Sequence, residues 1–234
     1  KEYRRQRQMC IRDRTTTGSW LFNSTTQQQS ITSAGKVLNF PITLNGTNIY
    51  LLQDNLTLAS DKTLVLTTGN LNLNNKSLST GFFSSSNTNT RSIAFGTGNI
   101  IITGNSGTVW ATSTATGLSY TGTPVVNLTY SGSTGSRQIN GGATTQLSEG
   151  NSVSFNISAG TDTLTLGGSN CFRSLDFTGF HGTISSSSSN SITIYGNLII
   201  PSTVSSITNT STWIFGSTSS CLLYTSDAAD DTPC

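Results

Sequence analysis

Hydrophobic and polar residues alternate along most of the chain with a period of two. Leucine occupies every second position of the run 70–74, and the runs 55–58, 161–166 and 191–195 repeat the pattern with Leu or Ile. Because successive side chains of a β-strand point to opposite faces, the alternation predicts short strands with one apolar face. Clusters of Gly, Asn and Ser between the runs favour turns. No segment favours a helix, since Thr, Ser, Asn and Gly all oppose one.

Short strands with Asn, Ser and Thr ladders at the turns predict an all-β fold, and specifically a parallel β-solenoid or β-helix. At about 20–25 residues per coil, the chain has room for about eight to ten coils. A β-sandwich, or a pair of them, is the alternative, because antiparallel strands at similar spacing produce a similar pattern. A disordered low-complexity tract is a third interpretation, which low charge and many β-branched residues disfavour. The apolar phase of the strands predicts an interior formed by Leu56, Leu58, Leu64, Leu66, Leu71, Leu73, Ile93, Phe95, Ile100, Ile102, Leu164, Leu166, Ile192 and Ile194.

The two ends of the chain resemble a translated sequencing-library adapter. A DNA string that encodes residues 9–13 has a reverse complement that encodes residues 222–225 in a shifted frame, and residues 4–8 and 226–230 extend the match outward. We therefore interpret 1–14 and 221–234 as adapter-derived scars and 15–220 as one repetitive β-solenoid region. We expect the scars to lie off the folded core.

Removing the ends changes what composition implies. Segment 15–220 keeps six Lys or Arg and five Asp or Glu, a net charge of +1, so its charge does not indicate nucleic acid as a partner. Cys171 is its only cysteine, which excludes a disulfide framework within the segment. No apolar run approaches the roughly 18 residues of a membrane span.

Internal matches suggest that the segment comes from a tandem array. The motif Gly-Asn-apolar begins at Gly69, Gly98 and Gly196. The run around Trp20 matches the run around Trp213, each as Trp-apolar-Phe. The segment would then be about one period of the array. We interpret Trp20, Trp110 and Trp213 as covers of coils or core edges, in preference to platforms for stacking sugars.

The runs 63–78 and 175–180, with the strands of 191–200, resemble the coils of repetitive adhesin-like proteins. The whole of 15–220 is similar to long repetitive proteins of uncultured, marine phage. Secreted bacterial adhesins have a similar repetitive sequence. The resemblance implies a virion fibre or appendage. The resemblance lies in the spacing of the repeats, and it implies no functional residue.

Few residues of the chain could act in catalysis or bind a ligand or metal. His181 is the only histidine, and Phe180-His181-Gly182 resembles the Gly-His-Gly of pectin-hydrolysing β-helices except at its first position. Glycoside hydrolysis also needs a carboxylate pair, and 15–220 has no adjacent acids. We therefore interpret His181 as a turn residue and Cys171 as an inward small apolar residue. Arg173 and Asp176 are expected to form a solvated surface pair. We predict no catalytic, cofactor-binding or metal-binding residue.

These observations favour a non-enzymatic structural or adhesive shaft segment of a phage virion fibre or secreted surface protein. The expected location is extracellular or on the virion surface. The expected partners are cell-surface or other virion components, with glycans among the candidate ligands, and a homo-oligomer is compatible with the pattern. The alternative is a polysaccharide-acting β-helix enzyme, such as a depolymerase or lyase on a fibre.

Overall fold

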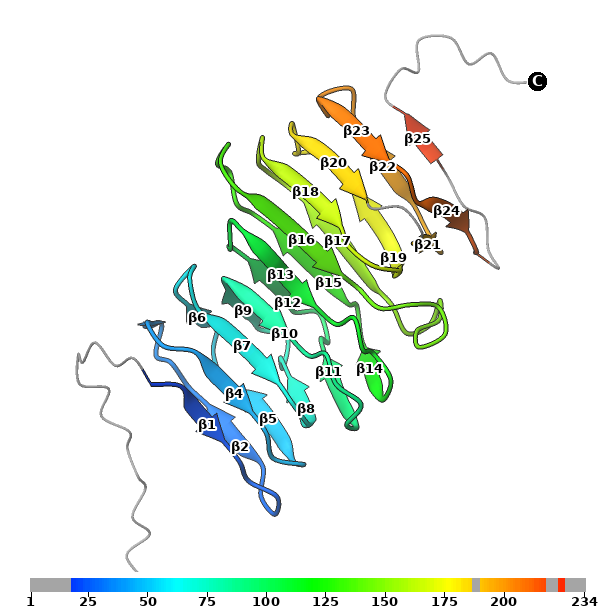
Figure 1. The fold of residues 1–234 in the computed structure, drawn as a ribbon. Coiled ribbons are helices and arrows are strands. Elements are labelled where there is room, and N and C mark those ends of the chain that lie inside the picture. The colour runs from blue at the N-terminus through cyan, green and yellow to red at the C-terminus, as the bar shows by residue number, and fades with distance from the viewer. Residues whose placement is uncertain (1–17, 187–189, 218–222, 226–234) are drawn as a thin grey trace, which may run out of the picture.

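The computed structural model describes residues 18–186, 190–217 and 223–225, which form β-strands and no helix. Every pairing between strands in this part of the chain is parallel. Figure 1 shows the strands stacked in successive turns along one axis, about nine turns in all. The predicted parallel β-solenoid is thus confirmed, and the β-sandwich is excluded because its neighbouring strands would run antiparallel.

Three sheets form the sides of the solenoid. Sheet A contains nine strands: β1 (Trp20–Phe22), β4 (Ile42–Leu44), β7 (Thr63–Leu66), β10 (Phe82–Ser84), β13 (Gly107–Ala111), β16 (Ser136–Asn140), β18 (Thr163–Leu166), β20 (Thr183–Ser186) and β23 (Ser206–Asn209). Sheet B contains β2 (Gln29–Ile31), β5 (Ile49–Leu52), β8 (Gly69–Asn72), β11 (Arg91–Ala94) and β14 (Leu118–Thr121). Sheet C contains β3 (Val37–Leu38), β6 (Leu56–Leu58), β9 (Ser77–Thr80), β12 (Asn99–Ile102), β15 (Val125–Leu128), β17 (Val153–Ile157), β19 (Asn170–Asp176), β21 (Ser191–Ile194), β22 (Leu198–Ile200), β24 (Thr212–Phe215) and β25 (Leu223–Thr225).

The first five coils visit sheets A, B and C in turn, and the later coils change this arrangement at β19. The first half of β19 pairs with β21, through Asn170 with Ile192, and its second half pairs with β22. On its other edge β19 pairs with β17 from Phe172 onward. In chain order the first half of β19, β21 and β24 therefore take the place that sheet B holds in earlier coils. In the sixth coil a loop, 141–152, stands at that place between β16 and β17. The second and third sides of the solenoid thus become one continuous sheet.

Coil length varies more than the sequence predicted. Trp20 pairs with Ile42 and Ile42 with Leu64, which gives a repeat of 22 residues (42 − 20 and 64 − 42). Phe83 pairs with Trp110, so that coil takes 27 residues (110 − 83), more than the 20–25 expected. Most of the additional residues lie in turns, but β13 itself contains a register shift between Thr108 and Trp110, where it pairs with β16.

The core is a continuous column of apolar side chains inside the coils. All fourteen residues predicted to line the interior are buried, each with 2% exposure or less. The middle coils also contain a column of aromatic rings that the alternation did not single out. Phe83 stacks on Trp110 with ring centroids 4.5 Å apart, and Phe155 packs edge-on between Trp110 and Phe172. These contacts bind four successive coils together, because each ring belongs to a different coil.

Polar ladders satisfy the backbone at the turns, as predicted. The side-chain Oδ1 of Asn75, a residue at φ 60°, accepts a hydrogen bond from the N–H of Thr97 in the next coil, at 2.9 Å. The Oδ1 of Asn55 accepts one from the N–H of Ser77 at the same distance. Asn and Asp adopt such turn conformations readily because their short side chains bond to nearby backbone groups.

Loop 141–152 covers the open edge of β14, the last strand of sheet B. The amide of Asn151 accepts a hydrogen bond from the N–H of Tyr120 (2.7 Å) and donates one to the carbonyl of Leu118 (2.9 Å). The Oε1 of Gln146 accepts a bond from the N–H of Ala115 at 3.0 Å. One side-chain amide thus takes the role of a neighbouring peptide group, and it blocks an edge that would otherwise invite pairing with another chain.

Two expectations about the ends need correction. Within the predicted scar 221–234 the structure describes 223–225, and these residues form β25, which pairs with β22. That part of the scar is therefore not off the core, because its backbone continues sheet C; segment 1–14 lies outside the described residues. The two Trp-apolar-Phe runs also differ in place, since Trp20 lies in sheet A and Trp213 in sheet C. Equivalent residues of a tandem repeat would occupy the same side of a coil, so this match does not indicate a period.

Candidate functional site

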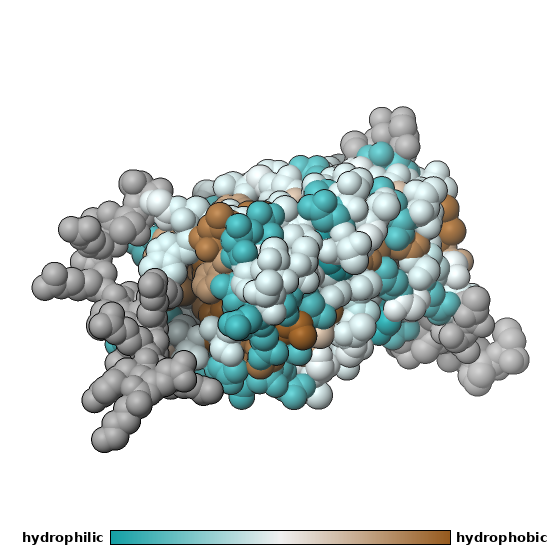
Figure 2. All heavy atoms as spheres, turned by 90° about the horizontal axis from the view of Figure 1, so that it is seen from below, coloured by the Kyte–Doolittle hydropathy of each residue, from teal (hydrophilic) through white to brown (hydrophobic). Residues whose placement is uncertain are grey.

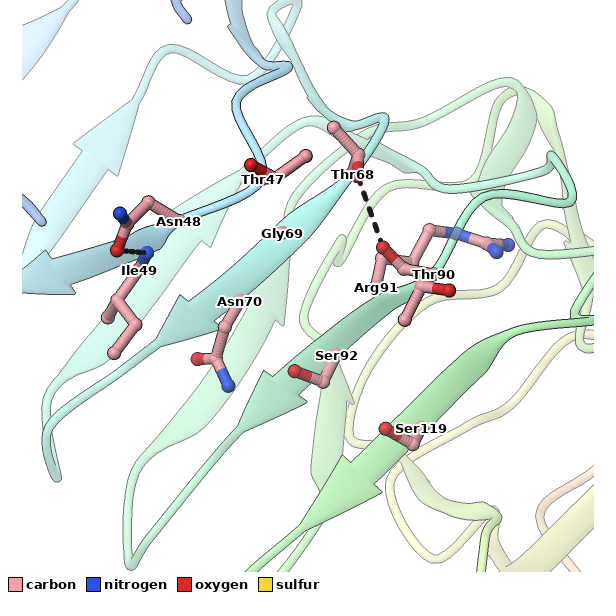
Figure 3. A pocket seen from close by; sticks show the side chains of 10 residues that line it. All are labelled: Thr47, Asn48, Ile49, Thr68, Gly69, Asn70, Thr90, Arg91, Ser92 and Ser119. Atoms are coloured by element: carbon pink, nitrogen blue, oxygen red, sulfur yellow. Dashed lines mark hydrogen bonds between the residues drawn. The ribbon is translucent and has the colours of Figure 1, made fainter. Parts of the chain in front are cut away.

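A shallow groove of about 430 Å³ on the outer face of sheet B is the candidate site (Figure 3). Its lining comes from the starts of four adjacent strands, β5, β8, β11 and β14, and from the corners that precede them. Five of the lining residues carry hydroxyl groups and two carry amides. They are Thr47, Asn48, Ile49, Thr68, Gly69, Asn70, Thr90, Arg91, Ser92 and Ser119.

The strand register places four of these side chains in one row. Ile49 pairs with Asn70, Asn70 with Ser92, and Ser92 with Ser119. All four occupy the outward phase of their strands, because Tyr50, Leu71 and Ile93 next to them are buried. The row therefore crosses the strands and runs along the solenoid axis for about 14 Å, three steps of about 4.8 Å.

Side-chain and backbone contacts hold the corner beside this row. The Thr68 hydroxyl donates to the carbonyl of Thr90 in the next coil, at 3.1 Å. Gly69 lies between them at φ 86°, and a Cβ there would come within 2.3 Å of the carbonyl oxygen of Gly46. Only glycine fits this backbone and this spacing.

Arg91 lies beneath the groove with its charge turned away from it. Its side chain is fully buried, and Figure 3 shows it extending away from the row of Asn70, Ser92 and Ser119. The guanidinium donates to Ser85 Oγ and to the carbonyls of Ser85, Asn89, Thr114 and Thr116, at 2.6–2.9 Å. Burial lowers the pKa of Arg91 from its ordinary value. The described contacts are with neutral oxygens, so this cation fastens two turns without a carboxylate.

A second buried arginine is paired with an acid. Arg137 Nε and Nη2 each donate to one oxygen of the Asp162 carboxylate at 2.7 Å, and both side chains are fully buried. The rings of Tyr130 and Phe180 lie 5.4 and 5.7 Å from the guanidinium carbon. This bidentate pair links β16 to the turn before β18. It resembles no catalytic arrangement, because aromatic rings and backbone enclose it.

The burial of these three charged residues was not predicted from the sequence. A signal for it was present, because Arg91 stands in phase with Ile93, and Arg137 in phase with Ile139. Asp162 likewise stands in phase with Leu164. Each therefore occupies an inward position of an alternating run. A charged residue in the apolar phase of a strand indicates a buried polar contact.

The residues that could act in catalysis or bind a metal do not come together in one site. His181 is exposed in the turn between β19 and β20, where its backbone N–H donates to the carbonyl of Gly160 at 2.9 Å. This agrees with its interpretation as a turn residue. Asp54 accepts bonds from the N–H groups of Ser33 and Ala34, and Asp61 pairs with Lys62.

Cys171 is 2% exposed, as predicted for an inward small residue, and burial raises the pKa of its thiol. A raised pKa makes it a poor nucleophile at neutral pH. The expected pair of Arg173 and Asp176 is wrong. Asp176 instead accepts bonds from the N–H and hydroxyl of Thr178, and no ion pair joins it to Arg173. The short Asx turn satisfies the carboxylate locally, because Thr178 is only two residues away.

The tryptophans agree with a covering role. Trp110 is buried, and Trp20 and Trp213 are partly buried against the core, with Trp20 stacked on Phe40 at 4.2 Å. Among the described residues, no group of three or more His, Cys, Asp or Glu could hold a metal ion. No helix in this part of the chain is long and apolar enough to cross a membrane. Comparisons with protein-family models, curated proteins and solved structures find no match to the chain.

Proposed function

We propose that the chain is a non-enzymatic structural or adhesive shaft segment of a phage virion fibre or a secreted surface protein. It acts outside the cell or on the virion surface, and its partners are cell-surface or other virion components. The observation that supports this most is the unbroken sheet A, whose nine strands stay parallel from the first coil to the last. Such a stack resists bending, because every coil is held to its neighbours by backbone hydrogen bonds and a common core.

The outer surface supports the same role. Most outward strand positions carry Ser, Thr or Asn, and Figure 2 shows a face that is mostly teal and white, with brown hydrophobic residues toward its two ends. Large exposed hydrophobic residues occur in the terminal coils, among them Leu21, Val37, Ile207 and Phe215. A neutral polar surface over a long core suits a shaft that must stay soluble at length and contact other surfaces along its side.

An experiment with surface polysaccharides separates this proposal from the enzymatic alternative. The protein would be incubated with intact bacterial cells and with isolated capsular and cell-wall polysaccharides. Retention of the protein and release of reducing ends would then be measured together. We expect retention without release. Release of reducing ends or unsaturated products that His181→Ala abolishes would overturn the shaft and favour a depolymerase.

A further inference from the structure

We propose that the sheet B groove binds a neutral, extended oligosaccharide. This inference rests on the adhesive role proposed above and names the class of ligand for that role. It follows from three properties of the groove, namely its charge, its shape and its rigidity.

The groove presents hydrogen-bonding groups and no accessible charge. Its hydroxyl and amide side chains both donate and accept, as the hydroxyl groups of a sugar do. Arg91, the only lining residue with a charged side chain, is 1% exposed and uses its guanidinium on turn oxygens. An anionic glycan or a phosphate would find no cation to pair with, so the chemistry selects a neutral ligand.

The shape selects a chain over a compact ligand. Ile49, Asn70, Ser92 and Ser119 repeat at the strand spacing along the solenoid axis, over about 14 Å. Ile49 is 37% exposed at one end and offers an apolar contact for the carbon face of a sugar ring. The Oδ1 of Asn70, in the middle of the row, is buried and has no hydrogen-bond partner, so the lining holds one unused acceptor.

The floor of the groove is fixed before a ligand arrives. The guanidinium of Arg91 fastens the corner carbonyl of Asn89 and that of Thr116 in the next coil. The bond from Thr68 to Thr90 fixes the corner on the other side. A rigid floor lowers the entropic cost of binding, which matters for a shallow site with few contacts.

Titration calorimetry on the full chain tests the inference. The probes are short linear oligosaccharides derived from cellulose, laminarin, amylose and mannan, with an oligomer of polygalacturonate as the anionic comparison. We expect at least one neutral probe to bind with a Kd below about 1 mM and the anionic oligomer not to bind. If no neutral probe binds, or only the anionic one does, the inference is wrong.

Matched variants locate the site. Ser92→Glu puts a charge in the middle of the row and should weaken binding at least about tenfold, whereas Ser79→Glu on β9 in sheet C should leave it unchanged. Asn70→Leu should weaken binding about tenfold by removing the amide. Asn99→Leu is its control, because Asn99 is equally half-buried and also has an unpartnered Oδ1, but lies in sheet C. Equal melting temperatures within each pair would verify that folding is intact.

The same variants separate this inference from the proposed function. If wild type binds a neutral probe and Ser92→Glu binds it equally well, the groove is not the site. If cell-surface retention persists in Ser92→Glu while the oligosaccharide is lost, the groove binds sugar and adhesion uses another face as well. If retention is absent in the wild type while the oligosaccharide binds at the groove, the adhesive role fails and the sugar site stands.

Discussion

Each of the two stacks of coils in this solenoid contains a buried arginine, and the two arginines are stabilised by different partners. The N-terminal stack, β1–β15, holds Arg91 with neutral oxygens of turns in its own and the next coil. The C-terminal stack, β16–β25, holds Arg137 with the carboxylate of Asp162. Arg91 is surrounded by several neutral dipoles and needs no counter-ion. Arg137 donates to one backbone carbonyl, that of Ala159, and otherwise depends on the opposite charge of Asp162.

The stacks also differ in their sheets, and the sixth coil explains the difference. In the N-terminal stack sheet B is separate from sheet C, and it ends at β14. Loop 141–152 then covers the edge with the side chains of Gln146 and Asn151. Beyond the loop, β19 runs through both sides without a corner. We call loop 141–152 the seam, because hydrogen bonds from its side chains take the place of the strand-to-strand hydrogen bonds that join the two stacks elsewhere.

The largest expected effect comes from a charge in either core. Leu66→Asp in the N-terminal stack and Ile194→Asp in the C-terminal stack should each lower the free energy of unfolding by more than about 3 kcal/mol, because each buries an unpaired carboxylate. Urea denaturation measures this. Val65→Asp and Ser185→Asp, at outward strand positions of the same two stacks, are the controls. Tolerance of both core variants would mean that the register is shifted by one residue.

Removing the counter-ion should destabilise the chain by a similar amount. Asp162→Asn leaves Arg137 buried without its anion and should destabilise the chain by about 3–5 kcal/mol. The double variant Arg137→Met with Asp162→Leu should recover most of this, since it buries no charge. Thermal unfolding of the single and double variants provides the comparison. A single variant as stable as wild type would contradict the dependence of Arg137 on Asp162.

The seam should be weaker than either core. Asn151→Ala leaves the Tyr120 N–H and the Leu118 carbonyl without partners and should cost about 1–3 kcal/mol. Hydrogen exchange at the Tyr120 amide should accelerate in the variant. Asn156→Ala, which removes an outward ladder bond to Asn127 on sheet C, should change stability by less than about 0.5 kcal/mol. Equal effects of the two would remove the special role of the seam.

The smallest effect concerns alkaline pH in the C-terminal stack. Burial, with the nearby Cys171 thiol, raises the pKa of Tyr195 from 10.0 to about 12. The folded state therefore favours the protonated phenol, and this stabilisation is complete below pH 10 and is lost as the pH rises from 10 towards 12. Tyr195→Phe should flatten the stability profile in that window. Because the chain has six tyrosines, the readout is the difference in tyrosinate absorbance between wild type and Tyr195→Phe, and a difference that already appears at pH 10 would contradict the shift.

The sequence predicted the strands and their faces because period-two alternation is a local property. The Leu residues of 70–74 and the Ile residues of 191–195 lie inward as that pattern requires. The parallel stacking followed from the turn ladders, of which Asn55 and Asn75 are examples. The phase of Arg91 and Arg137 was equally visible, although it was not used.

Other features depend on contacts between distant coils. Asn151 covers an edge formed by residues about thirty positions earlier, and nothing in its neighbourhood distinguishes it from other Asn residues in turns. The merging of two sides at β19 depends on a missing corner, which no turn residue marks. The groove likewise arises where Ile49, Asn70 and Ser92 line up across three coils. All three features depend on the register in which the strands pair, and the local sequence pattern does not determine that register.

Disulfide trapping tests the central claim, a parallel stack in register through both regions. With Cys10, Cys221 and Cys234 replaced by serine, one cysteine pair at Thr57 and Ser79 and another at Thr165 and Ser185 would each join outward neighbours on adjacent coils. Paired parallel strands place the Cα atoms about 4.8 Å apart, within the range of a disulfide. Both pairs should form disulfides rapidly under mild oxidation without loss of melting temperature. Failure of the second pair would contradict the continuous stack beyond the seam, and failure of both would contradict the solenoid.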